Sequence, residues 1–264
     1  MKQLLNISKY LLLLFVIASC DDKNLLDENN KWVYADTASG AQIKLIHVYP
    51  SLTPAVTAGN GPSVFIYRGN QKLNGTAAQA MAYGNVWPAS AVYGVIPTGN
   101  TPYYLVMNRV VGTVPTPKAG DTVATLAYDF QANKNYSVFL IDTAPSPKTL
   151  VVEDIITVPA AMKYRARFGN VGMNPTDTFD IYSVRAGANV ATGLTIKQMT
   201  GFSEFDVPTL SDTFYLRKKG TTTPNISSVF GFSPTSLRSY TFFVRGKTGI
   251  ATSRNTTLTF YTNR

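Results

Sequence analysis

IKLIHVY, residues 43–49, is an apolar run interrupted by Lys44 and His47, and a run of the same build, RARFGNV, follows at residues 165–171. Lys44 aligns with Arg167 and His47 aligns with Asn170, both at a spacing of 123 residues. Runs rich in β-branched and aromatic residues favour strands, and a strand pattern that recurs in order indicates a repeated domain. These two stretches therefore predict that one β-rich domain occurs twice in the chain.

The rest of the two halves aligns in the same order. The further matched pairs are Tyr67 with Tyr182, Pro97 with Pro208 and Tyr104 with Tyr215. The spacing shrinks along the chain to 111 residues, so the first copy has the longer loops, notably SLTPAVTAGNGPS at 51–63. We place the first domain at 36–159 and the second at 160–264, with VVEDIITVPAA (151–161) as joining strand and linker.

The composition beyond the N-terminal segment predicts an all-β fold. Short runs rich in β-branched and aromatic residues recur between turn-forming residues, and only GTAAQAMAYG (75–84) has a brief helical pattern. Many short strands with almost no helix favour β-sandwiches. The predicted strands are 43–49, 63–68, 103–108, 122–128 and 135–142 in the first half, and 163–168, 178–183, 213–218, 240–245 and 257–262 in the second.

The N-terminal segment has the build of a secretory signal. Lys2 and Lys9 precede a short apolar run, and the run ends in Ile17-Ala18-Ser19-Cys20, which contains the only cysteine of the chain. This ending resembles the lipobox of bacterial lipoproteins, which implies lipidation of Cys20, removal of residues 1–19 and a flexible tether at 20–35. The alternatives are an ordinary signal peptide with a chance cysteine and a buried thiol.

Two acidic residues follow this cysteine. Asp21 and Asp22 resemble the surface-export signal of Bacteroidetes lipoproteins, which implies an outer-membrane lipoprotein at the cell surface. In other Gram-negative bacteria an aspartate after the cysteine indicates retention at the inner membrane instead. A periplasm-facing location therefore stays open as the alternative.

The aligned strands also resemble a known family. The basic-apolar-apolar-histidine strand, a Val-Asp-Val-Tyr-like strand and a Tyr-x-x-x-Pro-x-Gly turn are similar to the domain of unknown function numbered 4397. The matching residues are Lys44, His47, Pro50, Val64 to Tyr67, Tyr93, Pro97 and Gly99 in the first copy, and Arg165, Arg167 and Phe179 to Tyr182 in the second. Asn170 replaces the histidine, and the usual Ser-Pro-Asp turn is missing from both copies. The resemblance implies two tandem immunoglobulin-like antiparallel β-sandwiches and no known enzymatic activity.

Residues for catalysis are few. His47 is the only histidine and lies in an apolar strand, so a structural role is expected rather than a Ser-His-Asp triad or a multi-histidine metal site. No glycine-rich phosphate loop or nucleophile elbow occurs. Two carboxylates would suffice for glycoside hydrolysis, but most acidic residues fall at turns or strand edges. We therefore expect no enzymatic activity, no metal and no cofactor.

Charge differs strongly between the two predicted domains. Residues 36–159 contain seven Lys and Arg against six acidic residues, whereas residues 160–264 contain thirteen against five, a net charge of +8. The run Arg217-Lys218-Lys219 is the densest basic stretch and a candidate contact for anionic glycans. The alternative is that these charges solvate exposed strands and prevent aggregation. No nucleic-acid motif is present, so nucleic acid is not expected as a partner.

Two further patterns are candidate sites. Tyr83, Trp87 and Tyr93 cluster among small residues and proline, and they predict either an exposed aromatic loop that binds a ligand or rings that cap the core. The threonines of three Asp-Thr-small/aliphatic motifs, Thr37, Thr122 and Thr143, resemble acceptors of Bacteroidetes protein O-glycosylation.

These observations predict an outer-membrane, lipid-anchored β-sandwich protein that acts as a binding or adhesion module without catalysis. Its partners would be the membrane, through the lipid on Cys20, and a glycan or an envelope protein. The alternative is a structural accessory subunit of an outer-membrane or periplasmic complex.

Overall fold

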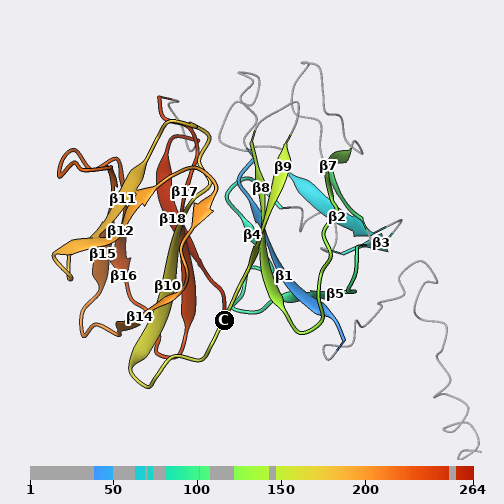
Figure 1. The fold of residues 1–264 in the computed structure, drawn as a ribbon, viewed down its shortest axis with the longest axis horizontal. Helices are drawn as coiled ribbons and strands as arrows, with labels where there is room; N and C mark the ends of the chain where they lie inside the picture. The colour runs from blue at the N-terminus through green and yellow to red at the C-terminus, as the bar shows by residue number, and fades with distance from the viewer. Residues whose placement is uncertain are drawn as a thin grey trace, which may run out of the picture. The chain divides into compact units, whose positions relative to one another are not determined.

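The computed structural model describes residues 39–49, 63–68, 71–73, 81–100, 102–107, 122–142, 147–249 and 254–264. Contacts divide the chain into two units, Met1–Ala35 and Asp36–Arg264, and every described residue belongs to the second unit. Within the described ranges all regular elements are strands, numbered β1 to β18, and Figure 1 labels most of them. The residues described contain no helix long and apolar enough to cross a membrane.

The first nine strands form one β-sandwich. Its β1 sheet has the order β4-β1-β8-β9, with β5 also paired to β1, and its β2 sheet has the order β3-β2-β6-β7. The strands are β1 (Ala41–His47), β2 (Val64–Arg68), β3 (Gln71–Lys72), β4 (Val86–Trp87), β5 (Gly94–Ile96), β6 (Tyr103–Met107), β7 (Thr122–Leu126), β8 (Asn135–Ile141) and β9 (Lys148–Glu153).

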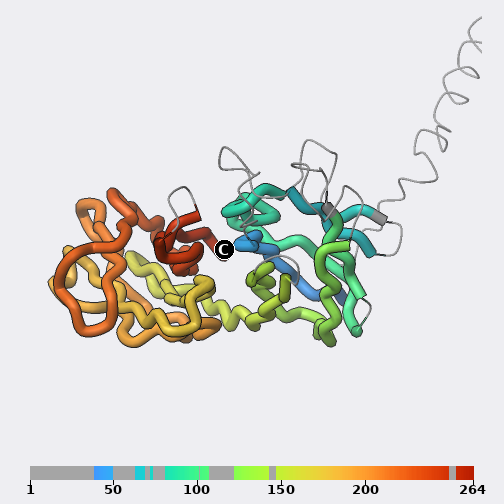
Figure 2. The backbone as a smooth tube through the Cα atoms, turned by 90° about the horizontal axis from the view of Figure 1, so that it is seen from above, coloured from blue at the N-terminus to red at the C-terminus, as the bar shows by residue number. Residues whose placement is uncertain are grey.

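The remaining nine strands form a second β-sandwich of the same design. Its β10 sheet has the order β13-β10-β17-β18, with β14 also paired to β10, and its β11 sheet has the order β12-β11-β15-β16. Figure 2 shows the chain completing the strands of the first sandwich, blue to green, before it enters the second. The strands are β10 (Lys163–Asn170), β11 (Phe179–Ser183), β12 (Ala188–Leu194), β13 (Gln198–Met199), β14 (Ser203–Asp206), β15 (Asp212–Lys218), β16 (Ser227–Phe232), β17 (Ser239–Arg245) and β18 (Thr257–Thr262).

Each sandwich has its own hydrophobic core. Ile43 and Leu45 of β1 meet Ile66 and Leu105 of the β2 sheet in the first core, and all four are buried. In the second core the aromatic residues Phe168 and Phe242 of the β10 sheet pack with Phe179, Phe214 and Phe232 of the β11 sheet. Alternate side chains of each strand point inward, and the two sheets of each sandwich pack together because this buries their apolar inner faces.

A third apolar cluster, the inter-sandwich cluster, joins the outer face of the β1 sheet to the outer face of the β10 sheet. Because successive side chains point to opposite faces, β1, β8, β10 and β17 are buried on both sides. The sequence of a strand buried on both faces is a nearly continuous apolar run, and SVFLI (137–141) in β8 is an example. The buried members of the inter-sandwich cluster are Ile46, Val48, Tyr83, Phe139, Ile141, Val171, Phe243 and Tyr261.

The predicted all-β fold of two tandem immunoglobulin-like antiparallel sandwiches is confirmed, with one parallel strand pair in each sandwich. β1 runs parallel to β8 with Lys44 opposite Ser137, and β10 runs parallel to β17 with Arg167 opposite Thr241. A parallel pair needs a long crossover, which the intervening strands provide. The predicted boundary at residue 160 lies between β9 and β10, but the division of the chain there stays a prediction.

All ten predicted strands are present, and the predicted helical pattern at 75–84 is absent where the structure describes it. Met81 makes an isolated bridge to Val64, and a turn follows. Residues 75–80 lie outside the described residues. The strands that the pattern did not predict are β3, β4, β5, β12, β13, β14 and β16, most of them short or edge strands.

The strand pairing agrees with the sequence alignment of the two halves. Tyr67 is the cross-strand partner of Tyr104 in the β2 sheet, and Tyr182 is the partner of Tyr215 in the β11 sheet. His47 Nδ1 accepts a hydrogen bond from the backbone N–H two residues on, at 3.3 Å. The side chain of Asn170 accepts the corresponding bond at 3.0 Å, so its replacement of the histidine keeps one structural contact.

Candidate binding surface

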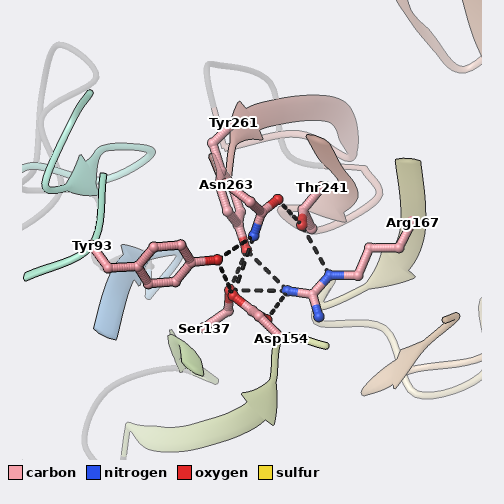
Figure 3. A network of polar contacts seen from close by, with 7 residues as sticks. All are labelled: Tyr93, Ser137, Asp154, Arg167, Thr241, Tyr261 and Asn263. Atoms are coloured by element: carbon pink, nitrogen blue, oxygen red, sulfur yellow. Dashed lines mark hydrogen bonds and ion pairs between the residues drawn. The ribbon is translucent and has the colours of Figure 1, made fainter. Parts of the chain in front are cut away.

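A buried polar network lies where the β1 sheet and the β10 sheet meet (Figure 3). Arg167 Nη2 lies 2.5 Å from Asp154 Oδ1, and the two side chains are only 2% and 0% exposed. The other carboxylate oxygen of Asp154 accepts hydrogen bonds from Tyr93 and Ser137 at 2.6 Å and from Asn263 at 3.2 Å. The cost of burying this carboxylate is therefore offset by one ion pair and three hydrogen bonds.

The rest of the network is equally well paired. Arg167 donates from Nε to Thr241 and from Nη2 to Ser137, both at 2.9 Å. Because the Ser137 hydroxyl already donates to Asp154, the Tyr261 hydroxyl is the donor in the 2.7 Å contact between Tyr261 and Ser137. These bonds join residues of both sandwiches in a single buried cluster.

The ionisation of the network favours a structural role. Burial is the largest single influence on Arg167 and opposes its charge, but Asp154, Tyr261 and Tyr93 together outweigh burial, so the pKa of the guanidinium is raised. Burial is the largest cause of the raised pKa values of Tyr93 and Tyr261, so both hydroxyls stay neutral at ordinary pH. A charged arginine and neutral tyrosines hold fixed hydrogen bonds rather than exchanging protons.

Lys44 occupies in the first sandwich the position that Arg167 has in the second. Its Nζ donates to the backbone oxygens of Ser90 at 2.6 Å and Pro88 at 3.2 Å, and it lies 5.4 Å from the ring centroid of Tyr93. Burial lowers the pKa of Lys44 to about 8, while the charge of Asp154 acts in the opposite direction.

Of the residues predicted either as an exposed aromatic loop or as rings that cap the core, Tyr83 is buried and Trp87 and Tyr93 are half-buried, which favours the second alternative. Tyr83 is buried in the inter-sandwich cluster with the Arg245 guanidinium 4.7 Å from its ring centroid. Trp87 packs against the first core, so closely to Gly94 that a Cβ on that glycine would lie 2.6 Å from Trp87 Cη2. Tyr93 belongs to the buried network. Since stabilising packing occupies all three rings, we do not assign them a ligand.

The predicted basic residues lie at the end of β15 in the β11 sheet. Arg217 is half-buried, and its guanidinium carbon lies 4.0 Å from the ring centroid of Tyr182. Its Nε donates to Asn225 at 2.8 Å. Lys218 and Lys219 are exposed. The structure therefore separates an ordered arginine, stacked on an aromatic ring, from two solvated lysines.

Arg217 is part of a larger aromatic–arginine face, which consists of Tyr182, Tyr215, Arg217 and Phe230. It is the outer face of the β11 sheet, because Ile181, Phe214 and Leu216 on the same strands point into the core. The Phe230 ring meets the Tyr215 ring edge-on at 6.2 Å. Strand pairing extends this row to Asn189 beside Tyr182 and to Ser228 beside Tyr215.

Asp180 lies on the same face of the β11 sheet, opposite Arg217 in the strand pairing, and orders the segments beside it. Its carboxylate is buried and accepts hydrogen bonds from the backbone N–H of Gly193 at 2.7 Å and of Gly220 at 2.9 Å. The first bond orders β12 at a register shift, and the second orders the turn after β15. Asp180 is therefore a positioning residue for the turn next to Lys219.

The other predicted sites are only partly covered by the structure. Thr122 is exposed at the start of β7, where a glycan could be attached, whereas Cys20, Thr37 and Thr143 lie outside the described residues. Their modification stays a prediction. No cluster of three His, Cys, Asp or Glu side chains suited to a metal occurs in the described ranges.

The sequence indicated only part of the aromatic–arginine face. The basic run pointed to Arg217, and Tyr182 and Tyr215 were visible as the tyrosines that recur in both halves. Phe230 gave no signal, because its exposure depends on a local irregularity of β16 next to Gly231, whose φ is +63°.

Comparisons with known proteins give no family for the chain. No family model matches it, and no curated protein matches it. Among solved structures it is similar to a carbohydrate-binding module of family 26 from Eubacterium rectale in complex with maltoheptaose, at 17% identity over 83% of this chain and 96% of that chain, with a TM-score of 0.23.

Two further solved structures are similar. The Bacillus anthracis TIE protein matches at 12% identity over 78% of this chain and 34% of that chain, with a TM-score of 0.20. A candidate cell adhesion protein from Bacteroides fragilis matches at 10% identity over 85% and 98% of the two chains, also with a TM-score of 0.20. At such low scores these neighbours carry no argument about function.

Proposed function

We propose that this protein is a lipid-anchored binding protein of the bacterial envelope that holds a glycan on its aromatic–arginine face, without catalysis. One observation carries the proposal: Phe230 is 73% exposed on an ordered sheet face, edge-on to Tyr215 and beside the stack of Arg217 on Tyr182. Exposed apolar groups surrounded by polar ones are typical of binding sites.

A glycan suits this face because it offers the matching chemistry. A sugar ring has C–H groups on its faces, which pack on aromatic rings, and hydroxyl groups at its edges, which need hydrogen-bond partners. Asn189, Arg217 and Ser228 are polar and lie in or beside the row of aromatic rings. Such a row along an ordered sheet face accommodates an extended chain of sugars.

Charge narrows the class of glycan. Lys218 and Lys219 are exposed next to Arg217, and residues 160–264 carry a net charge of +8. These charges favour glycans that carry carboxylate or sulfate groups. Affinity would then fall as salt concentration rises, because screening weakens contacts between exposed charges.

The anchor and the location follow from the N-terminal segment. The lipobox-like ending at Cys20 supports attachment to a membrane, and Asp21 and Asp22 support display at the cell surface. Protease treatment of intact cells tests this part: digestion of the protein supports surface display, and protection places it inside the envelope.

Glycan binding is tested with residues 21–264, which lack the lipid. A glycan array selects the ligand, and isothermal titration then measures its affinity for the variants Tyr215→Ala and Phe230→Ala. Each should weaken binding by about tenfold or more, as for aromatic residues central to an interface. Tyr104→Ala is the matched control, because Tyr104 pairs with Tyr67 in the first sandwich as Tyr215 pairs with Tyr182 in the second.

Equal affinity of the Tyr215→Ala variant and the control would refute this site. Silence on every array, together with co-purification of a stable envelope protein, would replace the glycan proposal with the structural accessory subunit.

A further inference from the structure

The inter-sandwich cluster is built from residues that occupy equivalent positions in the two sandwiches. Strand pairing defines the equivalence, because β1 pairs with β8 as β10 pairs with β17, with Lys44 opposite Ser137 and Arg167 opposite Thr241. The neighbouring strands correspond in the same way: β4 beside β1 corresponds to β13 beside β10, and β9 beside β8 corresponds to β18 beside β17. The equivalent pairs within the cluster are Val48 and Val171, Val86 and Met199, Phe139 and Phe243, and Val152 and Tyr261.

Two equivalent pairs also touch each other. The rings of Phe139 and Phe243 meet at 5.6 Å between centroids, with an interplanar angle of 68°. Asn263 donates to its counterpart Asp154 at 3.2 Å. In an assembly of two identical copies, a residue contacts its own equivalent only at the two-fold axis of an isologous interface. Two such contacts in one interface indicate an approximate two-fold axis between the sandwiches.

The polar network repeats the same relationship. Ser137 donates to Asp154 at 2.6 Å in the first sandwich, and Thr241 donates to Asn263 at 2.7 Å in the second. Lys44 lies over Tyr93 and Arg167 lies over Phe202, at 5.4 and 4.7 Å from the ring centroids. Tyr93 and Phe202 are equivalent because each precedes the strand that pairs with the start of β1 or β10.

The symmetry is broken at the two buried cations. Lys44 donates to the backbone of its own sandwich, whereas Arg167 reaches across to Ser137 and Asp154 of the other. The Arg167–Asp154 ion pair therefore forms when the first sandwich associates with the second. Two copies of the first sandwich would lack it, because each would have Lys44 in place of Arg167. The interface therefore favours association of the first half with the second.

We infer that the chain is a covalently linked dimer of one domain, in which the outer faces of the β1 and β10 sheets form an isologous interface that holds without its linker. Beyond Asp154 the linker contributes little, since Ile155 and Val158 are 71% and 74% exposed. The interface resembles a protein core, because Ile46, Phe139 and Phe243 are at most 1% exposed. Each sandwich is thus the partner that fits the other.

A cleavage experiment on the folded full chain tests this inference. A recognition sequence for a specific protease is inserted between Thr157 and Val158, and the chain is cut after folding. We expect the two halves to elute together in size-exclusion chromatography at micromolar concentration, with the mass of the uncut chain measured by light scattering. Separate elution of the wild-type halves would overturn the inference.

Substitutions test the two-fold relationship. Phe139→Ala and Phe243→Ala should each raise the dissociation constant of the cut halves by about tenfold or more, while Phe230→Ala, outside the interface, should leave it unchanged. Circular dichroism of the uncut variants checks that both sandwiches stay folded. A large effect of one interface substitution and none of the other would overturn the equivalence. If a variant fails to fold, elution of the cut wild-type chain still decides whether the interface is self-sufficient.

Discussion

The carboxylate of Asp180 accepts a hydrogen bond from the backbone N–H of Gly220 at 2.9 Å, so a buried acid on β11 holds the turn that follows β15. The same carboxylate also receives the N–H of Gly193 on β12. One side chain thus orders both segments that flank Lys219, and its removal affects the fold and the proposed binding surface together.

Asp180→Ala should lower the free energy of unfolding by about 2 kcal/mol or more, because two backbone N–H groups lose their acceptor. Urea unfolding measures the change. Asp129→Ala is the control, since the side-chain hydrogen bond of Asp129 to Gln131 is exposed. Equal stability of the two variants would contradict the role assigned to Asp180.

Arg167→Met should lower the free energy of unfolding by about 3–5 kcal/mol, because it leaves the buried Asp154 carboxylate without its ion pair. Lys163→Met provides the comparison, since the ion pair of Lys163 with Asp206 lies at the surface and should matter little. Thermal or urea unfolding of both variants gives the difference. If Arg167→Met lowers the free energy of unfolding no more than Lys163→Met does, the network is dispensable for stability.

Lys44 should make stability depend on pH in the alkaline range. Its pKa is about 8 in the folded protein and near 10.5 when unfolded, so the unfolded chain binds more protons between these values. The contribution of Lys44 to the free energy of unfolding therefore rises with pH from about 8 to 10.5. The free energy of unfolding, measured at several pH values, should rise for the wild type relative to Lys44→Met as the pH increases. A difference between the two proteins that does not change with pH would contradict the prediction.

Gly94→Ala should destabilise the first sandwich by about 1–3 kcal/mol, because the new methyl group overlaps the Trp87 ring. Displacement of Trp87 should also change its fluorescence, measured in a Trp32→Phe background that leaves Trp87 as the only tryptophan. Gly201→Ala is the matched control, since no atom lies within 4 Å of a Cβ at that position. Unchanged emission and stability in Gly94→Ala would disprove the close packing.

The strands that the sequence predicted are those that carry apolar side chains at regular spacing or in a nearly continuous run. YTFFVR (240–245) is a nearly continuous apolar run, as expected of a strand buried on both faces, and it forms all of β17 except Ser239. The short strands β4 and β13 have two residues each, and they exist only because β1 and β10 offer paired backbone groups. Such strands have no local pattern to detect, since their stability comes from their neighbours.

The candidate sites were also hard to predict, because they depend on residues that are distant in the sequence. The aromatic segment around Trp87 was compatible with exposure and with burial, because composition does not say whether a second sheet covers a ring. Arg217 and Lys218 lie on β15, where the sequence predicted a strand at 213–218. The stacking of Arg217 on Tyr182 requires β11, because Tyr182 lies 35 residues earlier in the sequence.

The sequence by itself determined that one β domain occurs twice, because a repeated alternation of side chains survives changes in loop length. Only the tertiary structure decided what the matched residues do. Lys44 and Arg167 align in sequence and sit at equivalent positions, yet one bonds to its own sandwich and the other pairs with Asp154 across the interface. That difference depends on which sheet faces pack together and how far each side chain reaches.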